Sequence, residues 1–151
     1  MTIIAERDQE AIREHLNTNM TGDVEIVMFT ERPSLIIVPG RQSCETCEDT
    51  RKLLEEVSAL SDKVKLIVHE LASAPEEAER LGIDRVPAFV FSGAAKGSVR
   101  FFGIPSGYEF SAFIGDLVDT STGTTDLSEA TREFLDSLTE NLNIKVFTTP
   151  T

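Results

Sequence analysis

The spacing of hydrophobic and polar positions along the chain predicts a mixture of helices and strands. Between residues 4 and 18, apolar residues form one stripe at helical spacing among charged ones. Residues 24–29 are instead a nearly unbroken run of β-branched and apolar residues, which indicates a strand covered on both faces. Patterns and turn signals in the rest of the chain predict helices over 44–60, 75–81, 106–118 and from 126 onward, and strands over 64–68, 88–91, 99–102 and 144–148.

The order of these elements predicts how the strands pair. Helix 44–60 and strand 64–68 follow an earlier strand at the spacing of a βαβ unit, so the two strands should be parallel. Two apolar runs, 24–29 and 34–38, precede that helix, and either could be the strand that leads into it. The glycine-containing turn 93–97 joins the next two strands into a hairpin.

Local signals also predict several helix ends. Residues 73–76 and 106–109 both read Ser-x-x-Glu, the form of a capping box at a helix start. Gly82 follows the predicted helix 75–81 at the position of a C-cap. Residues 120–125 are polar and predict a linker before the last helix.

Composition narrows the class of protein. A chain of 151 residues with 40% hydrophobic residues is long enough for one domain with a substantial core. The net charge of −12, without any Lys/Arg cluster, makes nucleic acid and anionic membranes poor partners. The longest apolar runs have the length of strands and residues 1–8 lack the features of a secretory signal, so we expect a cytoplasmic protein.

Chemistry is expected at Cys44 and Cys47, the only cysteines of the chain. They stand three positions apart where an amphipathic helix is predicted to begin, so their Cα atoms should lie within the range of about 4.4 to 6.8 Å that a disulfide requires. The unpaired N–H groups and partial positive charge of a helix N-terminus lower the pKa of a thiol there. In the cytosol, where thiols are held reduced, a lone CxxC is more often catalytic or metal-binding than a structural cross-link.

A metal site is the main alternative for such a cysteine pair. Structural zinc needs about four ligands, and the remaining candidates, His15 and His69, fall on different predicted elements without ligand spacing. A bridging iron–sulfur cluster would need thiolates from a second chain. We therefore favour dithiol redox chemistry, with no metal ligands and no cofactor besides the redox-active Cys44–Cys47 pair.

The predicted order of elements, with CxxC opening a helix and Pro87 preceding a strand, resembles the thioredoxin fold. The resemblance implies an α/β, thioredoxin-like three-layer α/β/α sandwich with a central mixed sheet. In this chain we expect the sandwich to have an extra N-terminal helix and a C-terminal appendage of one helix and one strand.

A closer resemblance is carried by residues 83–88, 100–110 and 143–151. These segments are similar to the prokaryotic protein disulfide oxidoreductases, or glutaredoxin-like proteins, which contain two fused thioredoxin-like units with one CxxC each. The mapping makes residues 1–142 the first unit and residues 143–151 the first strand of a second unit in a longer protein. The N-terminal domain of the alkyl hydroperoxide reductase flavoprotein subunit is also similar, but its first unit lacks the cysteines.

The resemblance implies a thiol–disulfide oxidoreductase that acts on protein thiols and disulfides and is recharged by an upstream reductase. Alternatives are a docking or electron-relay module with a vestigial dithiol, or a metal-binding or iron–sulfur-binding glutaredoxin-like domain. Cys44, at the exposed helix end, would be the attacking thiolate, and Cys47, one turn into the helix, the resolving thiol. The resemblance also favours a cis Val86–Pro87 bond, which would leave the Val86 backbone free to bind an extended substrate.

Two features depart from the resembled family. Residues 31–43 form a longer connection than usual, and Glu45-Thr46 replaces the proline or aromatic residue common between the cysteines. The carboxylates of Glu45, Glu48 and Asp49 would raise the pKa of a nearby thiol against the effect of the helix terminus. The nearby basic residues that could offset them are Arg41 and Arg85. We expect Glu45, Thr46 and Arg85 to modulate the reactivity of the pair.

Overall fold

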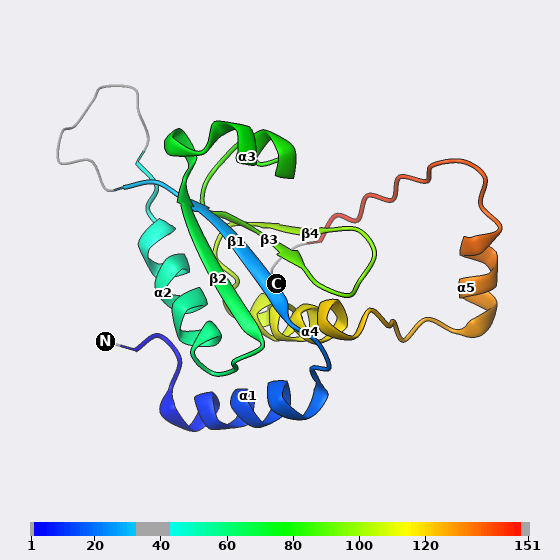
Figure 1. Ribbon diagram of the computed structural model, residues 1–151, viewed down its shortest axis with the longest axis horizontal. Helices are drawn as coiled ribbons and strands as arrows, with labels where there is room; N and C mark the ends of the chain where they lie inside the picture. Colours follow the sequence, from blue (N-terminus) through cyan, green and yellow to red (C-terminus); the bar gives the residue numbers. More distant parts are fainter. Residues whose placement is uncertain (1, 33–42, 149–151) are drawn as a thin grey trace.

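The computed structural model describes residues 2–32 and 43–148, and a four-stranded sheet with the order β2-β1-β3-β4 is its centre (Figure 1). The strands are β1 (Val24–Thr30), β2 (Val64–Glu70), β3 (Ala88–Ser92) and β4 (Val99–Phe102). β1 pairs in parallel with β2, and the β1–β3 and β3–β4 pairs are antiparallel. The predicted βαβ unit and hairpin are therefore confirmed.

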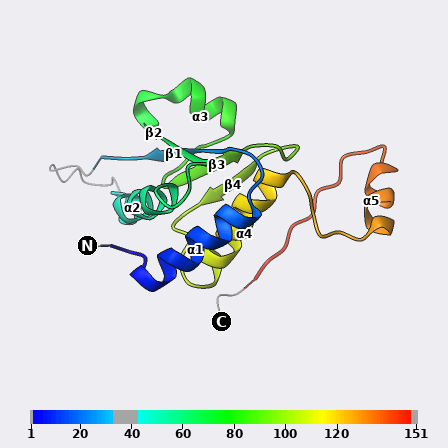
Figure 2. The ribbon, with the colours of Figure 1, turned by 60° about the horizontal axis from the view of Figure 1, so that its bottom comes forward.

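Helices cover both faces of this sheet. They are α1 (Glu6–Asn19), α2 (Cys47–Ser58), α3 (Pro75–Leu81) and α4 (Tyr108–Thr122), and a short 3₁₀ turn, Leu71–Ser73, precedes α3. A further helix, α5 (Glu129–Asp136), lies away from the sheet (Figure 1). Figure 2 shows α1, α2 and α4 on one side of the sheet and α3 on the other. The fold is the predicted three-layer thioredoxin-like sandwich with a mixed sheet.

β1 is the buried centre of the molecule. Because successive side chains of a strand point to opposite faces, Ile26 and Met28 pack with α1, α2 and α4, whereas Val27 and Phe29 pack with α3. This agrees with the prediction of a strand covered on both faces. β1 is the strand that precedes α2 among the described residues, and the alternative run 34–38 lies outside them.

Aromatic side chains fill much of the larger core. Phe89, Phe91 and Phe113 are fully buried, and the Phe89 ring stacks on Phe101 with centroids 5.0 Å apart. Phe102, although aromatic, is not part of this core, because its side chain is 43% exposed. It lies opposite Ala88 at the edge of the sheet, outside the cluster formed under α3.

The two predicted capping boxes do not form. The N-cap of α3 is Ala74 and that of α4 is Gly107, and no side-chain hydrogen bond caps either helix. Before α4 a backbone carbonyl takes the place of the serine side chain, because the Ser106 carbonyl accepts from the Glu109 N–H. The Ala74 carbonyl accepts from the Ala78 N–H, which is the ordinary first hydrogen bond of α3. Gly107, with φ 59°, turns the chain between Ser106 and α4.

Other helix ends follow the sequence more closely. Gly82 ends α3 in the left-handed region, with φ 69°, as its C-cap position predicted. α4 continues to Thr122, so the predicted linker begins only at Gly123. Ser128 caps α5 by accepting a hydrogen bond from the Thr131 N–H at 3.2 Å.

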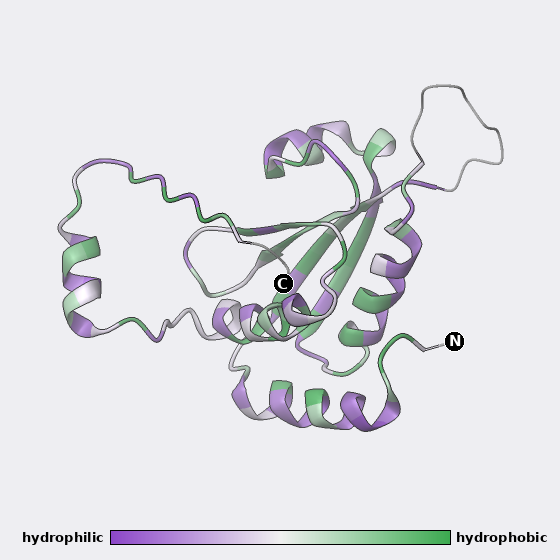
Figure 3. Ribbon diagram, turned by 180° about the vertical axis from the view of Figure 1, so that it is seen from behind, coloured by the Kyte–Doolittle hydropathy of each residue, from purple (hydrophilic) through white to green (hydrophobic). Residues whose placement is uncertain are grey.

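The C-terminal segment stands apart from the sheet. Figure 3 shows α5 away from the sheet and its covering helices, with the chain before α5 running outward and the chain after it running back toward them. Residues 144–148 do not form the expected strand, since no other strand lies beside them to supply hydrogen-bond partners. The segment exposes apolar side chains that elsewhere would be core: Phe134, Leu135, Leu138, Leu142, Ile144, Val146 and Phe147.

Candidate functional site

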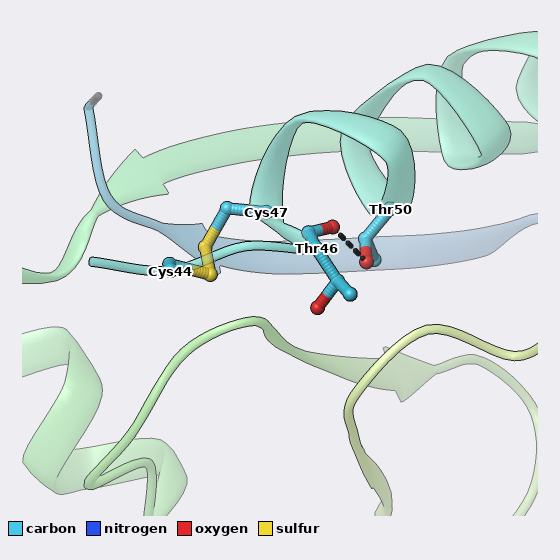
Figure 4. Close-up of a disulfide and its surroundings, with 4 residues drawn as sticks. All are labelled: Cys44, Thr46, Cys47 and Thr50. Carbon is cyan, nitrogen blue, oxygen red and sulfur yellow. Dashed lines mark hydrogen bonds between the residues drawn. A yellow bond between two sulfur atoms is a disulfide. The ribbon is translucent and has the colours of Figure 1, made fainter. Parts of the chain in front are cut away.

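Cys44 and Cys47 lie where the chain enters α2, and they form a disulfide (Figure 4). Their Cα atoms are 5.5 Å apart, within the range expected from the sequence spacing. The helix begins at Cys47 and not at Cys44, so the first cysteine lies just before the helix. Cys47 is 3% exposed and Cys44 is half-buried, which leaves Cys44 the more accessible sulfur.

Thr50 fixes the backbone between the two cysteines, and the sequence reasoning missed it. Its side chain is fully buried, and its hydroxyl donates a 2.7 Å hydrogen bond to the Thr46 carbonyl (Figure 4). The Thr50 N–H donates to the same oxygen at 2.9 Å. A polar residue on the apolar face of α2, one turn after Thr46, is the signal that could have identified it.

The acidic residues beside the disulfide are partly neutralised by their own helix. Glu48 accepts a salt bridge from Lys52 at 2.6 Å, and Glu55 accepts one from Arg51 at 2.7 Å. The hydrogen bond from Lys52, followed by its charge, lowers the pKa of the exposed Glu48 carboxyl. Glu48 is therefore ionised, but its effect on the cysteines is reduced by a cation that the sequence reasoning did not consider.

A cavity of about 630 Å³ adjoins the disulfide between α2 and the ends of β1 and β2. Both cysteines contribute to its wall, and most of its other lining side chains are charged. Arg32 and Glu70 form an ion pair across the ends of the two strands. Charged side chains around a redox pair would favour polar partners over purely apolar ones.

Val86 and Pro87 do not line that cavity, but they lie at the same end of the sheet. The pairing of Phe29 with Ala88 brings Pro87 to the end of β1, after which the chain leads to α2. The Val86–Pro87 bond is cis, as expected. Pro87 is buried, and its carbonyl accepts a 2.8 Å hydrogen bond from the Gly103 N–H. Within the described parts of the chain, no hydrogen bond uses the Val86 N–H or carbonyl.

Arg85 contacts Asp84 and Phe102. Its guanidinium donates two hydrogen bonds to the Asp84 carboxylate, at 2.8 and 3.1 Å, and lies 5.4 Å from the centroid of the Phe102 ring. The hydrogen bond from Arg85 lowers the pKa of the Asp84 carboxyl. The charge of Arg85 is thus balanced by the Asp84 carboxylate. Arg85 is therefore less able to counter the effect of the nearby carboxylates on the pKa of the thiols. Arg41, the other expected basic residue, lies outside the described residues.

The two histidines have separate environments. His15 contacts Asn19 on α1, and the His69 ring lies 5.7 Å from the Phe29 ring centroid. Across residues 2–32 and 43–148, no three His, Cys, Asp or Glu side chains are arranged to hold a metal ion. No helix in the described part of the chain has the length and apolar character needed to cross a membrane.

Solved structures of other proteins are similar to this chain over most of its length. A protein disulfide oxidoreductase from Aeropyrum pernix K1 is similar, with 30% identity, a TM-score of 0.73 and coverage of 89% of this chain. The alkylhydroperoxide reductase protein AhpF from Enterococcus faecalis has 19% identity and a TM-score of 0.72, also over 89% of this chain. The chain spans 55% and 61% of these two longer chains, respectively.

Sequence comparison gives the family directly. No curated protein matches the chain. The family model described as "Thioredoxin domain" matches residues 35–115, which is 81 of the 151 residues and includes both cysteines and the cis proline. The chain therefore belongs to the thioredoxin domain family.

Proposed function

We propose that this protein is a thiol–disulfide oxidoreductase that exchanges disulfides with protein substrates through Cys44 and Cys47. The observation that carries the proposal is the pairing of the chain's two cysteines at the start of α2, with one sulfur accessible and the other buried. The similar Aeropyrum pernix protein is itself named a protein disulfide oxidoreductase. The specific activity on protein disulfides is our inference from this similarity.

In the reducing direction, the Cys44 thiolate attacks one sulfur of the substrate disulfide. A Cys44–substrate disulfide forms, and the other substrate sulfur leaves as a thiolate that takes a proton from water. Cys47 then loses its proton, and its thiolate attacks the Cys44 sulfur, which releases the second substrate thiolate. The substrate gains two electrons, and the protein is left with the Cys44–Cys47 disulfide; an upstream reductase restores the dithiol.

Other residues of the site support this exchange. We propose that the Val86 backbone pairs with an extended substrate beside Cys44, because its N–H and carbonyl have no hydrogen-bond partner in the described part of the chain and Pro87 is cis. Glu45 and Thr46, between the cysteines, and Arg85 would tune the reactivity of the pair. The chemistry needs no metal or organic cofactor, and the cytoplasm, where thiols are kept reduced, is the location that suits it.

Trapping tests the roles of the two cysteines. Cys47→Ser should accumulate a covalent mixed disulfide with protein substrates that contain a disulfide, because the Cys44 thiolate can attack that disulfide but nothing resolves the product. Cys44→Ser should accumulate little, since the remaining sulfur is buried. The reverse pattern on a non-reducing gel would overturn the assignment.

Turnover tests the activity itself. With dithiothreitol as reductant, the wild type should reduce insulin disulfides faster than a Cys44→Ser/Cys47→Ser double variant, which is the matched control. Equal rates would rule out the oxidoreductase and favour a docking role. Stoichiometric zinc or iron in elemental analysis would contradict the metal-free mechanism.

We further propose that a second thioredoxin-like unit begins with the segment from Ser128 to Thr148, earlier than residue 143, where the family resemblance placed its start. Residues 10–16, EAIREHL, and 129–135, EATREFL, are identical at five of seven positions. Residues 26–30, IVMFT, and 144–148, IKVFT, are identical at three of five. The first members of these pairs belong to α1 and β1, so the second members have the order of elements with which a thioredoxin-like unit of this type starts.

Burial supports this second proposal. Ile26 and Phe29 are fully buried, whereas their counterparts Ile144 and Phe147 are 75% and 90% exposed. Such side chains need a core of their own, which a further unit with its own CxxC would provide. The parent reading frame tests this directly: a CxxC encoded directly after Thr151 is expected, and a stop codon at that point would defeat the proposal.

A further inference from the structure

The turn before β3 is connected to the end of β4 by three separate contacts. Ala88 pairs with Phe102 in the sheet, and the Gly103 N–H donates to the Pro87 carbonyl at 2.8 Å. The third contact is made by side chains, because the Arg85 guanidinium lies over the Phe102 ring. Val86 lies in the chain between Arg85, which makes the third contact, and Pro87 and Ala88, which make the other two.

The third contact is the only one of the three that reaches across the cis bond. Both backbone contacts begin at Pro87 or later, so apart from the packing of the Val86 side chain against the core under α3 they leave the direction of residues 84–86 unconstrained. Arg85 is exposed, and an exposed side chain of its length would ordinarily be mobile. Here its planar guanidinium is held on its edge by the Asp84 carboxylate and on its face by the Phe102 ring.

The exposure of Phe102 becomes understandable in this arrangement. An aromatic ring at the edge of a sheet, outside the core, contributes little to packing on its own. Val99, on the same strand, is exposed to a similar extent, 39% against 43%, but has no comparable partner among the described residues. The two positions differ in that the Arg85 guanidinium lies over the Phe102 ring.

We propose that Phe102 is a positioning residue for substrate binding: through Arg85 it holds the backbone of Val86 in the orientation that pairs with an extended protein substrate. This rests on the proposed function, in which Val86 binds the substrate chain. Phe102 touches neither the cysteines nor the reacting sulfurs in this scheme. Its loss should therefore weaken the binding of protein substrates and leave the exchange chemistry intact.

Steady-state insulin reduction with dithiothreitol provides the test. For Phe102→Ala and Phe102→Leu, KM for insulin should rise about three- to fivefold, the size expected for a cation–π contact at an exposed site, with kcat unchanged. Phe102→Tyr keeps the ring face and should restore the wild-type KM. Val99→Ala, the matched control on β4, should leave KM unchanged. Bis(2-hydroxyethyl) disulfide, which has no peptide backbone to pair with Val86, should react at the wild-type rate with every variant.

A second measurement does not depend on activity. Amide hydrogen exchange at Gly103, whose N–H is bonded to the Pro87 carbonyl, should be faster in Phe102→Ala than in Val99→Ala, because the turn has lost one of its anchors. Equal exchange in these two variants, or a wild-type KM in Phe102→Leu, would overturn the proposal. A parallel loss of activity on the small disulfide would also overturn it, since positioning of a peptide would then not be the cause.

Failure of the proposed function would look different. In that case the wild type would reduce insulin no faster than the double cysteine variant, whatever stands at position 102. The exchange rate of the Gly103 amide would still decide whether Phe102 orients the turn.

Discussion

The hydroxyl of Thr50 offers a quantitative test of how the disulfide segment is held. Thr50→Val removes the 2.7 Å hydrogen bond to the Thr46 carbonyl and nearly preserves the side-chain shape. The carbonyl keeps the Thr50 N–H as a partner at 2.9 Å, so no buried acceptor is orphaned. The expected loss in the free energy of unfolding is therefore in the lower half of the range for a hydrogen bond, about 0.5 to 1 kcal/mol.

Two further substitutions separate the hydroxyl from the methyl group of this buried side chain. Thr50→Ser keeps the hydroxyl and loses one buried methyl, at a cost of about 1 kcal/mol. Thr50→Ala loses both groups, so its cost should be roughly the sum, about 2 kcal/mol. The hydroxyl contribution is then obtained twice, from wild type against valine and from serine against alanine.

Urea denaturation of the oxidised protein measures these differences. With a slope of roughly 2 to 3 kcal/mol/M, Thr50→Val should lower the midpoint by about 0.3 M. Thr18→Val, an exposed position on α1, is the control and should leave the midpoint unchanged. The reasoning is refuted if Thr50→Val is as stable as the wild type and Thr50→Ala costs no more than Thr50→Ser.

Two other contacts give predictions of stability. The buried Ser121 hydroxyl accepts from the Thr21 and Gly22 N–H groups, both at 2.9 Å, and donates to the Gly22 carbonyl at 2.7 Å, so Ser121→Ala should cost about 2 kcal/mol in urea denaturation. A loss within error of zero would mean that water replaces the hydroxyl. The hydrogen bond and charge of Lys65 lower the pKa of the Asp23 carboxyl, so this pair contributes stability above the pKa of the unfolded carboxyl, about 4. Lys65→Met should therefore reduce the free energy of unfolding at pH 7, and the difference from wild type should disappear as the pH falls through the lowered pKa; a difference that persists at the acidic end would contradict this.

Several features of the site follow from local sequence and are found as predicted. The nearly unbroken apolar run at 24–29 predicts a central strand, because such a run is typical of a strand buried on both faces. The spacing of Cys44 and Cys47 brings their Cα atoms within disulfide range, a property of the short chain segment between them rather than of the surrounding fold. The resemblance of residues 83–88 to known oxidoreductases supplied the cis bond at Pro87, which spacing alone would not have favoured.

Other features depend on residues distant in sequence and could not be predicted from local patterns. A Ser-x-x-Glu sequence creates a capping box only if the preceding backbone aligns the serine with the first turn, and the turn at Gly107 prevents this before α4. The contact between Arg85 and Phe102 exists because β4 returns beside β3. Residues 144–148 have the composition of a strand, yet a strand is completed by its neighbours' hydrogen bonds, and those come from tertiary structure. The sequence by itself thus determined the hydrophobic periodicity of the helices and strands and the position of the reactive cysteine pair. The tertiary structure decided which side chains cap the helices, hold the turn before β3 and cover the strands, because these roles require groups that are brought together through space.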